Sequence, residues 1–373
     1  MGESTGFSAT NFFLWPFIAA AAAGDALSAQ AGEMARLLSA SSDTQAPPRL
    51  EWWTPNRVPL QLPTMDLRDF TAVGRADGTA TLVCAPFALH SATVADLAPG
   101  HSLIEALMRN GCRRLFLTDW RSATPEMRHF TIDNYLAELN VAVDEIGAPV
   151  DLVGLCQGGW LALIYAARFP DKVRKLVLAG APIDTDAHAS RFTVAAQTLP
   201  IVVFDELTRL GEGRMLGQRA VELWEPALKS EDVAGALQVA PDELARQKTL
   251  QQRFATWNSA TIDLPGPFYR QAVLWLFKEN RLAAGRFVAL GRQVDLGVVR
   301  HPLFLVGTRE DEVVPLPQLM ATRHLVGTSS HDIESATSPG NHLSLFVGAE
   351  TLRSAWPRVA RWLAEPQVAA RAA

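Results

Sequence analysis

The sequence predicts an α/β fold in which a mostly parallel central sheet is covered by helices on both faces. Segments typical of buried strands alternate with amphipathic helices between residues 81 and 179, and the strand segments are continuously apolar. Continuous apolar runs indicate strands that are buried on both faces. The strand-helix-strand order requires crossover connections, which place helices over the sheet.

The first elements follow from short β-branched runs and from apolar residues at helical spacing. We expect strands at residues 81–85 and 114–119, with a helix at 103–110 between them. An amphipathic helix at 132–146 then leads into a strand at 150–155. These lengths are typical of buried strands and of helices that cover them.

A second series of elements completes the predicted sheet. A helix at 160–168 is followed by a strand at 175–179, and two more strands return much later, at 302–306 and 330–335. The residues at 352–363 have the spacing of a closing helix. No internal repeat interrupts this order.

Residues 185–285, which we call the cap, break the alternation. They carry helical patterns, a polar stretch at 229–248 and many aromatic residues, but no convincing strand pattern. The aromatic residues are Phe192, Phe204, Trp224, Trp257, Phe268, Trp275 and Phe277. A helical insertion that precedes the return of the sheet is typical of a lid over a site. We therefore expect a helical segment and linker at 1–50, and a catalytic domain at 51–373 that carries the cap.

The N-terminal residues predict an alanine-rich helix at 11–38, followed by a Ser- and Pro-rich linker at 39–63 that becomes extended. This helix either packs on the main domain or docks on a hydrophobic surface. Its apolar stretch at 12–23 is too short to cross a bilayer, and no basic residue precedes it. We expect neither a signal peptide nor a transmembrane segment.

Composition narrows the class further. The chain has 373 residues, of which 48% are hydrophobic and 20% are charged, which is typical of a globular protein. A net charge of -5 without a basic run argues against nucleic acid as a partner. The three cysteines, Cys84, Cys112 and Cys156, lack disulfide or zinc-ligand spacing, so we expect a reducing cytoplasm and no metal site.

Cys156 stands at a turn from strand to helix. An apolar run ends at Gly154, and Gly158 and Gly159 follow the cysteine before the helical residues. Glycines on both sides of the cysteine suit a turn that packs tightly against neighbouring backbone, with the side chain held at its apex. This pattern, Gly-x-Cys-x-Gly, is that of a nucleophile elbow with sulfur in place of the usual serine oxygen. By itself it equally fits a buried core cysteine.

Two later loops strengthen the interpretation as a nucleophile. A strand that begins at Leu303 runs into a loop with Asp311, and a further loop carries His342. The order nucleophile, acid, histidine, each after a strand, is that of the α/β-hydrolase fold. In such a triad His342 takes the proton from Cys156 and later returns one, while Asp311 orients the imidazole and stabilises its charged form.

Other residues compete for these roles. Glu310 or Glu312 could replace Asp311 as the acid. The three acidic residues together are more often a solvated loop than a metal site. The competing histidines are His90, His301, His324 and His331. A substrate contact is an alternative role for His90, since it lies near the loop that follows the first core strand.

An acyl-transfer site also needs two donors for the oxyanion. One is expected to be the backbone N–H of Gln157, the residue after the nucleophile. The second is expected from the loop that starts at Cys84. Pro86 has no N–H to donate, so Phe87 is the candidate there.

From about Pro59 onward the chain resembles polyhydroxyalkanoate synthases, which polymerise 3-hydroxyacyl-CoA. Asp151-Leu-Val-Gly-Leu-Cys-Gln-Gly-Gly159 is similar to their Gly-x-Cys-x-Gly-Gly box, and Phe277-Lys-Glu-Asn-Arg-Leu282 and Asp311-Glu-Val-Val-Pro315 resemble further segments. The resemblance implies that Cys156 holds the growing acyl chain as a thioester. Where the family usually has Gly-Gly-His-Ile, this chain has Gly-Asn-His-Leu at residues 340–343.

The resemblance also implies substrates, partners and rivals. Coenzyme A would be part of the substrate and product, with no separate cofactor, and the length resembles that of compact synthases that act with a partner subunit. A homodimer, contact with a polyester granule surface and a cytoplasmic location are further expectations. The alternatives are an intracellular polyhydroxyalkanoate depolymerase, an acyl-CoA thioesterase of the same fold, and a non-catalytic granule-surface protein. The acyl acceptor, hydroxyl or water, stays open at this point.

Overall fold

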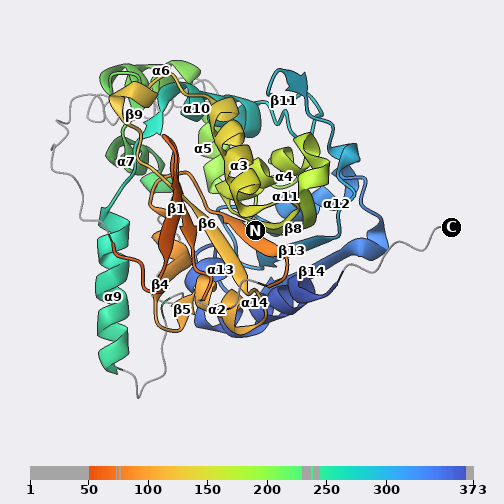
Figure 1. Cartoon of the computed structure of the whole chain (residues 1–373). Helices are drawn as coiled ribbons and strands as arrows, with labels where there is room; N and C mark the ends of the chain where they lie inside the picture. Colours follow the sequence, from red (N-terminus) through yellow and green to blue (C-terminus); the bar gives the residue numbers. More distant parts are fainter. Residues whose placement is uncertain (1–49, 73, 75–76, 229–236, 238–243, 367–373) are drawn as a thin grey trace, which may run out of the picture. The chain divides into compact units, whose positions relative to one another are not determined.

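An eight-stranded sheet forms the centre of the described part of the chain (Figure 1). The structure, a computed structural model, describes residues 50–72, 74, 77–228, 237 and 244–366, so the helix expected at 11–38 lies outside it. The strand order is β1-β2-β6-β3-β7-β8-β13-β14. From β6 to β14 all neighbours pair in parallel, whereas β1 and β2 join antiparallel. The predicted fold class, with a mostly parallel sheet, is confirmed.

The strands expected from the sequence are present with small shifts at their ends. In spatial order the strands are β1 (Arg57–Gln61), β2 (Met65–Asp69), β6 (Arg114–Trp120), β3 (Ala80–Cys84), β7 (Val150–Leu155), β8 (Val173–Ala179), β13 (Leu303–Thr308) and β14 (Ile333–Ser338). Every residue of β3, β7 and β13 is buried, which is the burial that their continuous apolar runs predicted.

The strands β1 and β2, at one side of the sheet, were not expected, because residues 39–63 were interpreted as a linker that becomes extended and no strand was predicted at 65–69. β2 carries charged residues that break its apolar pattern, and these charges are paired within the sheet. Asp69 accepts a hydrogen bond from Arg57 at 2.8 Å, and Arg68 donates to Asp119 at 2.9 Å. Pairing of this kind permits charged residues in a partly buried strand.

Helices cover both faces of the sheet. Figure 1 shows α3 (Ile132–Ile146) and α4 (Gln157–Arg168) on one side, with α2 (Leu103–Arg109) and α14 (Ala349–Ala364) on the other. The starts of two of these helices are fixed by side-chain caps: Ser102 accepts from the N–H of Glu105 at 3.0 Å, and Thr131 and Asn134 form a capping box. None of the helices in the described ranges is long and apolar enough to cross a membrane.

Among the described residues between β8 and β13, the regular structure is helical apart from two short strand pairs. Its helices are α5 (Arg191–Thr198), α6 (Ile201–Leu210), α7 (Gly217–Leu228), α9 (Leu244–Ser259), α10 (Gly266–Gln271) and the π-helix η5 (Ala272–Lys278). The two-residue strands β9 (Arg214–Met215) and β10 (Leu264–Pro265) pair here, where no strand was expected. Two residues are too few to show an alternating pattern. A second short pair, β11 (Val288–Ala289) and β12 (Arg292–Gln293), follows the π-helix.

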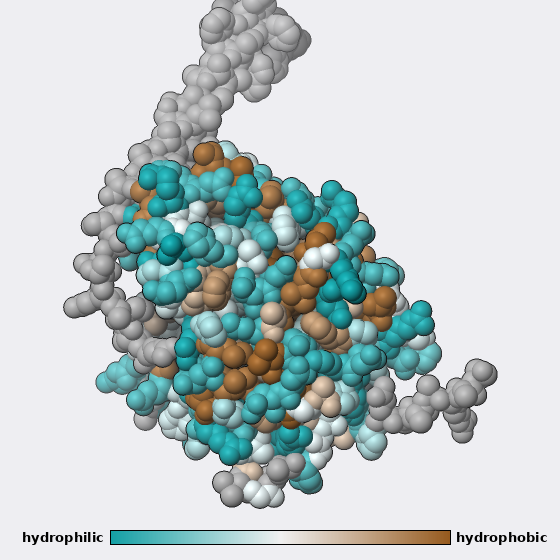
Figure 2. All heavy atoms as spheres, turned by 45° about the horizontal axis from the view of Figure 1, so that its top comes forward, coloured by the Kyte–Doolittle hydropathy of each residue, from teal (hydrophilic) through white to brown (hydrophobic). Residues whose placement is uncertain are grey.

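The surface on the side of α6 is mostly hydrophilic with apolar groups between (Figure 2). Among the described residues of the cap, Val194 on α5 and Val202 on α6 are 52% and 64% exposed. On α6, Phe204 and Leu207 point inward and are buried, whereas Leu210 at the end of the helix is 41% exposed. The cap helices therefore use their apolar faces for packing within the domain.

Candidate active site

Cys156 lies between the end of β7 and the start of α4, with φ 48° and ψ −117°. A positive φ is uncommon for a residue with a side chain and marks a sharp turn. The turn is held because the Cys156 N–H donates to the carbonyl of Ala179 at 2.8 Å and the Gly159 N–H donates to the carbonyl of Cys156 at 2.8 Å. The thiol is thereby presented, partly exposed, at the top of the sheet.

The glycines of the elbow lie where no side chain would fit. A Cβ at Gly158 would be 2.2 Å from the carbonyl oxygen of Cys84, and one at Gly154 would be 2.5 Å from the Cα of Gly159. At Gly159 it would be 2.3 Å from the Cβ of Ala181. The start of α4 therefore approaches the neighbouring strands as closely as backbone atoms allow, as the sequence predicted for Gly154 and Gly158.

Asp311 and His342 meet beside the elbow. His342 Nδ1 donates to Asp311 Oδ2 at 2.8 Å, and the other carboxylate oxygen accepts from the N–H groups of Val313 and Val314 at 3.0 and 2.7 Å. The Cys156 thiol lines the same cavity as this imidazole, and its sulfur raises the pKa of His342. Both side chains are buried, so the pair is fixed in orientation and shielded from solvent.

The charges around His342 favour its protonated form. Burial alone would lower the pKa of His342, but the Asp311 carboxylate and the Cys156 sulfur raise it, and the net result is a pKa well above 6.5. A histidine in this setting can take the proton of a neighbouring thiol and hold it as an imidazolium.

The neighbouring acids are placed elsewhere. Glu310 accepts a hydrogen bond from the N–H of Gly340 at 2.6 Å, and the side chain of Glu312 is 54% exposed and lies 3.8 Å from Arg191. Within the described residues, Asp311 is the acid of this run that pairs with His342.

Of the competing histidines, His90 alone lines the same cavity as Cys156 and His342. His301 precedes β13, and its Nε2 is buried without a partner among the described residues. His324 belongs to the short helix α12 (Thr322–Leu325), and His331 is exposed and bonds Ser329 at 2.7 Å.

The loop of His342 has a fixed shape despite its departure from the Gly-Gly-His-Ile pattern. The Oδ1 of Asn341 accepts hydrogen bonds from the N–H and hydroxyl of Ser344, at 3.1 and 2.9 Å. These bonds hold the turn that leads into the short helix α13 (Ser344–Val347), and Gly340 before the turn has φ +92°. Asn341 thus contributes its side chain to the position of the histidine.

Gly180 is a residue of the site that sequence reasoning missed. It directly follows β8, has φ +54°, and a Cβ there would lie 3.1 Å from His342 Cε1 and 2.7 Å from Leu345. Its glycine therefore leaves room for the imidazole. The one signal in the sequence is a glycine after an apolar strand, which does not reveal what lies beside it.

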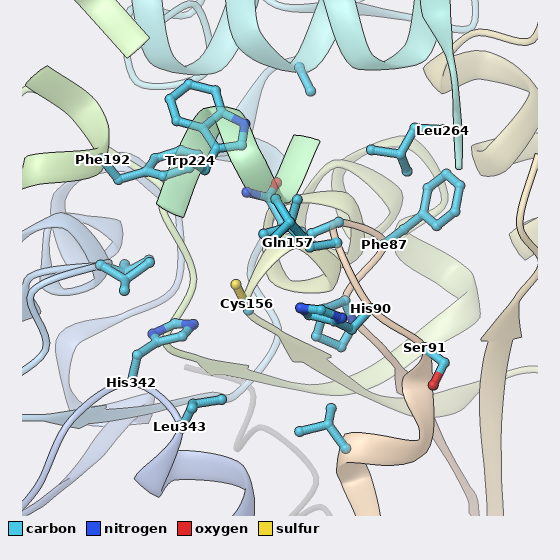
Figure 3. A pocket seen from close by; sticks show the side chains of 18 of the residues that line it. Phe87, His90, Ser91, Cys156, Gln157, Phe192, Trp224, Leu264, His342 and Leu343 are labelled. Atoms are coloured by element: carbon cyan, nitrogen blue, oxygen red, sulfur yellow. The ribbon is translucent and has the colours of Figure 1, made fainter. Parts of the chain in front are cut away.

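A cavity of about 520 Å³ opens above these groups. Figure 3 shows Cys156 in projection between the rings of His342 and His90, with Phe192, Trp224 and Phe87 around it. The aromatic residues of the cap that line the cavity are Phe192, Trp224, Phe254, Trp257, Phe268, Tyr269 and Phe277. Of the aromatics noted in the sequence, two lie elsewhere. Phe204 stacks behind Trp224, with ring centres 6.0 Å apart, and Trp275 packs edge-to-face on Phe287, with ring centres 5.4 Å apart. The walls are therefore mainly apolar, as expected of a small-molecule site.

The two residues expected to form the oxyanion hole also line this cavity. Phe87 lies in the loop after β3, and its ring stacks on Tyr135 with centres 4.6 Å apart. Gln157 is the first residue of α4, where a backbone N–H has no partner within the helix. The Gln157 side chain accepts from the Trp160 indole at 2.5 Å. Their role as donors stays a prediction.

The other two cysteines are buried away from the cavity. Burial raises the pKa of both Cys84 and Cys112 to about 12. Cys84 ends β3 and is paired in register with Gly154. Among the residues that the structure describes, no group of three or more His, Cys, Asp or Glu side chains could hold a metal ion.

Comparison with known proteins agrees with this fold. The family model of the alpha/beta hydrolase fold matches residues 96–349. A poly(3-hydroxyalkanoate) polymerase subunit PhaC from Allochromatium vinosum is 26% identical over 276 residues, which cover 72% of this chain and 76% of that protein. The subunit of the same name from Synechocystis is 28% identical over 285 residues, covering 73% and 74%.

A solved structure of similar fold is the monoacylglycerol lipase of Paleococcus ferrophilus, with a TM-score of 0.52, 15% identity, and coverage of 80% of this chain and 98% of the lipase. At this identity the likeness concerns the fold. The resemblance to polyhydroxyalkanoate synthases is confirmed by the polymerase relatives. By its family model, the chain belongs to the α/β-hydrolase fold family.

Proposed function

We propose that the protein is an acyltransferase of the polyhydroxyalkanoate synthase type, which polymerises 3-hydroxyacyl groups from 3-hydroxyacyl-CoA. The observation that carries this proposal is the position of Cys156: it lines a mainly apolar cavity together with His342, whose pKa its sulfur raises and which is itself paired with Asp311. The polymerase relatives, which match about three quarters of the chain, support the substrate class.

In the acylation step, His342 takes the proton of Cys156, and the thiolate attacks the carbonyl carbon of the CoA thioester. The carbon–sulfur bond to CoA then breaks, and the departing CoA thiolate takes the proton from His342. One thioester replaces another, so the acyl-enzyme lies close in free energy to the substrate. Asp311 stabilises the imidazolium that exists between the two proton transfers.

In the elongation step, the hydroxyl of an incoming 3-hydroxyacyl-CoA attacks the thioester on Cys156. His342 takes the hydroxyl proton and returns it to the departing sulfur, so an ester bond forms while the thioester breaks. The extended chain, now on CoA, acylates Cys156 again and releases free CoA. Each cycle thus adds one unit. The cycle needs one cysteine, and Cys156 is the one cysteine of the described residues that lines the cavity.

The tetrahedral intermediates of both steps carry an oxyanion. We assign its stabilisation to the backbone N–H groups of Gln157 and Phe87, which belong to residues on the cavity wall. Donors that are fixed in place before the reaction need no reorganisation when the charge develops. No cofactor takes part, since coenzyme A enters and leaves with the acyl group.

The acceptor distinguishes this proposal from a hydrolase of the same fold. Purified protein incubated with 3-hydroxybutyryl-CoA is expected to release CoA and form polymer. CoA release with free 3-hydroxybutyrate instead would indicate a depolymerase or thioesterase, and a folded sample without CoA release would contradict both enzymes on this substrate. The same measurement of CoA release, made with polyester particles present, tests whether the protein contacts a granule surface.

The cysteine variant tests the triad directly. Cys156→Ala is expected to abolish CoA release and leave the circular-dichroism spectrum and melting temperature near those of the wild type. CoA release by this variant at the wild-type rate would contradict the role of Cys156. A size measurement of the active sample shows whether it acts as a monomer or as the expected homodimer. CoA release by the purified chain alone shows that no partner subunit is needed.

A further inference from the structure

We propose that His90 is a specificity residue, whose Nε2 accepts a hydrogen bond from the 3-hydroxyl of the first 3-hydroxyacyl group that is loaded onto Cys156, before elongation converts that hydroxyl into an ester. This inference rests on the proposed function, because it assigns a role in selecting the hydroxyacyl substrate. His90 lies in the loop between β3 and the short helix η1 (Ala92–Ala95), and it lines the cavity together with Cys156.

The loop of His90 is fastened to the cap. The N–H of Ile262 donates to the carbonyl of Leu89 at 3.0 Å, and the backbones of His90 and Thr261 form an isolated antiparallel β-bridge. The ring of His90 packs on that of Trp257, with centres 4.6 Å apart. These contacts hold the imidazole in one place on the wall, which a residue that reads a substrate group requires.

The partner of Nδ1 determines which ring nitrogen carries the hydrogen. Nδ1 lies 3.4 Å from the carbonyl oxygen of Ala260, and a carbonyl can only accept. The hydrogen therefore sits on Nδ1, and Nε2 keeps its lone pair. Burial lowers the pKa of His90 to about 4, so the ring is neutral at neutral pH. No described residue forms a hydrogen bond with Nε2.

Two other acceptors of the cavity are already engaged. The Oε1 of Gln157 accepts from the indole of Trp160 at 2.5 Å, and the hydroxyl of Tyr269 accepts from the indole of Trp224 at 2.9 Å. Nε2 of His90 is thus an acceptor that remains available on a wall made mainly of aromatic and aliphatic side chains.

A neutral acceptor in an apolar cavity distinguishes two kinds of acyl group. The hydroxyl of a 3-hydroxyacyl chain can donate to Nε2, and it would otherwise be buried without a partner. An unsubstituted acyl chain of the same length leaves Nε2 unpaired. A site built to bind a hydroxyl rejects the analogue that lacks it, and one such hydrogen bond corresponds to about a tenfold difference in rate.

His90 positions the hydroxyl and does not deprotonate it. A ring that stays neutral to low pH is a weak base, whereas the Asp311–His342 pair provides a strong one. The two imidazoles face the same cavity, with Cys156 between them in the view of Figure 3. This arrangement assigns proton transfer to one histidine and recognition to the other.

The test compares the rate of acyl-enzyme formation with 3-hydroxybutyryl-CoA and with butyryl-CoA, measured by rapid quench and intact-protein mass with enzyme in excess. The wild type is expected to prefer the hydroxyacyl substrate. His90→Phe, which keeps an aromatic ring beside Trp257, is expected to lower this preference about tenfold. His90→Gln, whose side-chain amide also offers an acceptor, is expected to keep most of it. His90→Leu serves as a second apolar variant if the phenylalanine protein does not fold.

Val94→Ala is the matched control, since Val94 lines the same cavity without a polar group. It is expected to change both rates alike and leave their ratio unaltered. An unchanged ratio in His90→Phe, or in His90→Leu, would overturn the role of His90 while the acyl-enzyme itself still supports the thioester chemistry. A lowered ratio with free acid as the final product would support the role of His90 and contradict polymerisation. A folded wild type that forms no acyl-enzyme would contradict both.

Discussion

His342 and His90 face one cavity, yet their surroundings shift their pKa values in opposite directions. The Nδ1 of His342 donates to a carboxylate, and its pKa is raised well above 6.5. The Nδ1 of His90 lies against the Ala260 carbonyl, and burial lowers its pKa to about 4. Both rings are largely enclosed, so the difference comes from their partners: the Asp311 carboxylate and the Cys156 sulfur beside His342, and the Ala260 carbonyl beside His90. A charged partner offsets the cost of burying an imidazolium, and a neutral carbonyl does not.

The largest expected effect separates the two histidines by function. His342→Ala removes the base and is expected to lower CoA release at least ~10³-fold, because proton transfer in both steps depends on it. His90→Gln is expected to stay within a few-fold of the wild type. Steady-state release of CoA from 3-hydroxybutyryl-CoA measures both. Equal losses in the two variants would contradict the division of roles.

Asp311→Asn removes the charged partner and keeps the size of the side chain. We expect the pKa of His342 to fall, since burial then acts without the carboxylate that opposes it, and CoA release to fall ~10²- to 10³-fold. In the wild type His342 stays protonated at pH values well above 6.5, and in the variant deprotonation occurs at lower pH. Titration of the imidazole by nuclear magnetic resonance measures this shift. An unaltered pKa would contradict the assigned cause.

Gly180→Ala tests how closely the surroundings of His342 fix its ring. The added Cβ would lie 3.1 Å from His342 Cε1, so we expect a displaced imidazole and an activity loss of about tenfold, in line with a small misplacement of a reacting group. Gly100→Ala is the matched control, because Gly100 also has positive φ, +76°, and has no atom within 4 Å of the added carbon. An equal loss of activity in both variants would show that backbone strain, rather than contact with His342, causes the loss.

The smallest effect concerns the wall behind His90. The indole of Trp257 donates to the carbonyl of Ser91 at 2.9 Å, and Trp257→Phe removes this hydrogen bond while keeping an aromatic ring. We expect the free energy of unfolding to fall by about 1 kcal/mol. Urea denaturation followed by fluorescence or circular dichroism measures it. A gain in stability would contradict the view that this bond fastens the loop to the cap.

The sequence predicted the parallel strands of the sheet better than the two antiparallel strands at one side of it. The helix at Ile132–Ile146 and the strand at Val150–Leu155 have the predicted bounds, because periodicity and burial agree there. The strand Met65–Asp69 was missed, since its charges are compensated by residues that are distant in sequence, such as Asp119. Propensity within a short window does not contain such pairings.

The candidate site shows the same limit. Chain order alone indicated Cys156, Asp311 and His342, and the structure brings these three together. The space that Gly180 leaves for His342 could not be predicted, because it arises from contact between segments more than 150 residues apart. The direction of the cap aromatics, including Phe204 behind Trp224, likewise depends on how helices pack.

The burial of Cys84 and Cys112 permits selective chemical labelling of Cys156. Both thiols are enclosed and have a pKa of about 12, whereas Cys156 is partly exposed to the cavity. A small alkylating reagent at neutral pH should therefore modify one cysteine per folded chain. The amount of label bound then counts the competent sites in a preparation, and a rate divided by that count is a true turnover number.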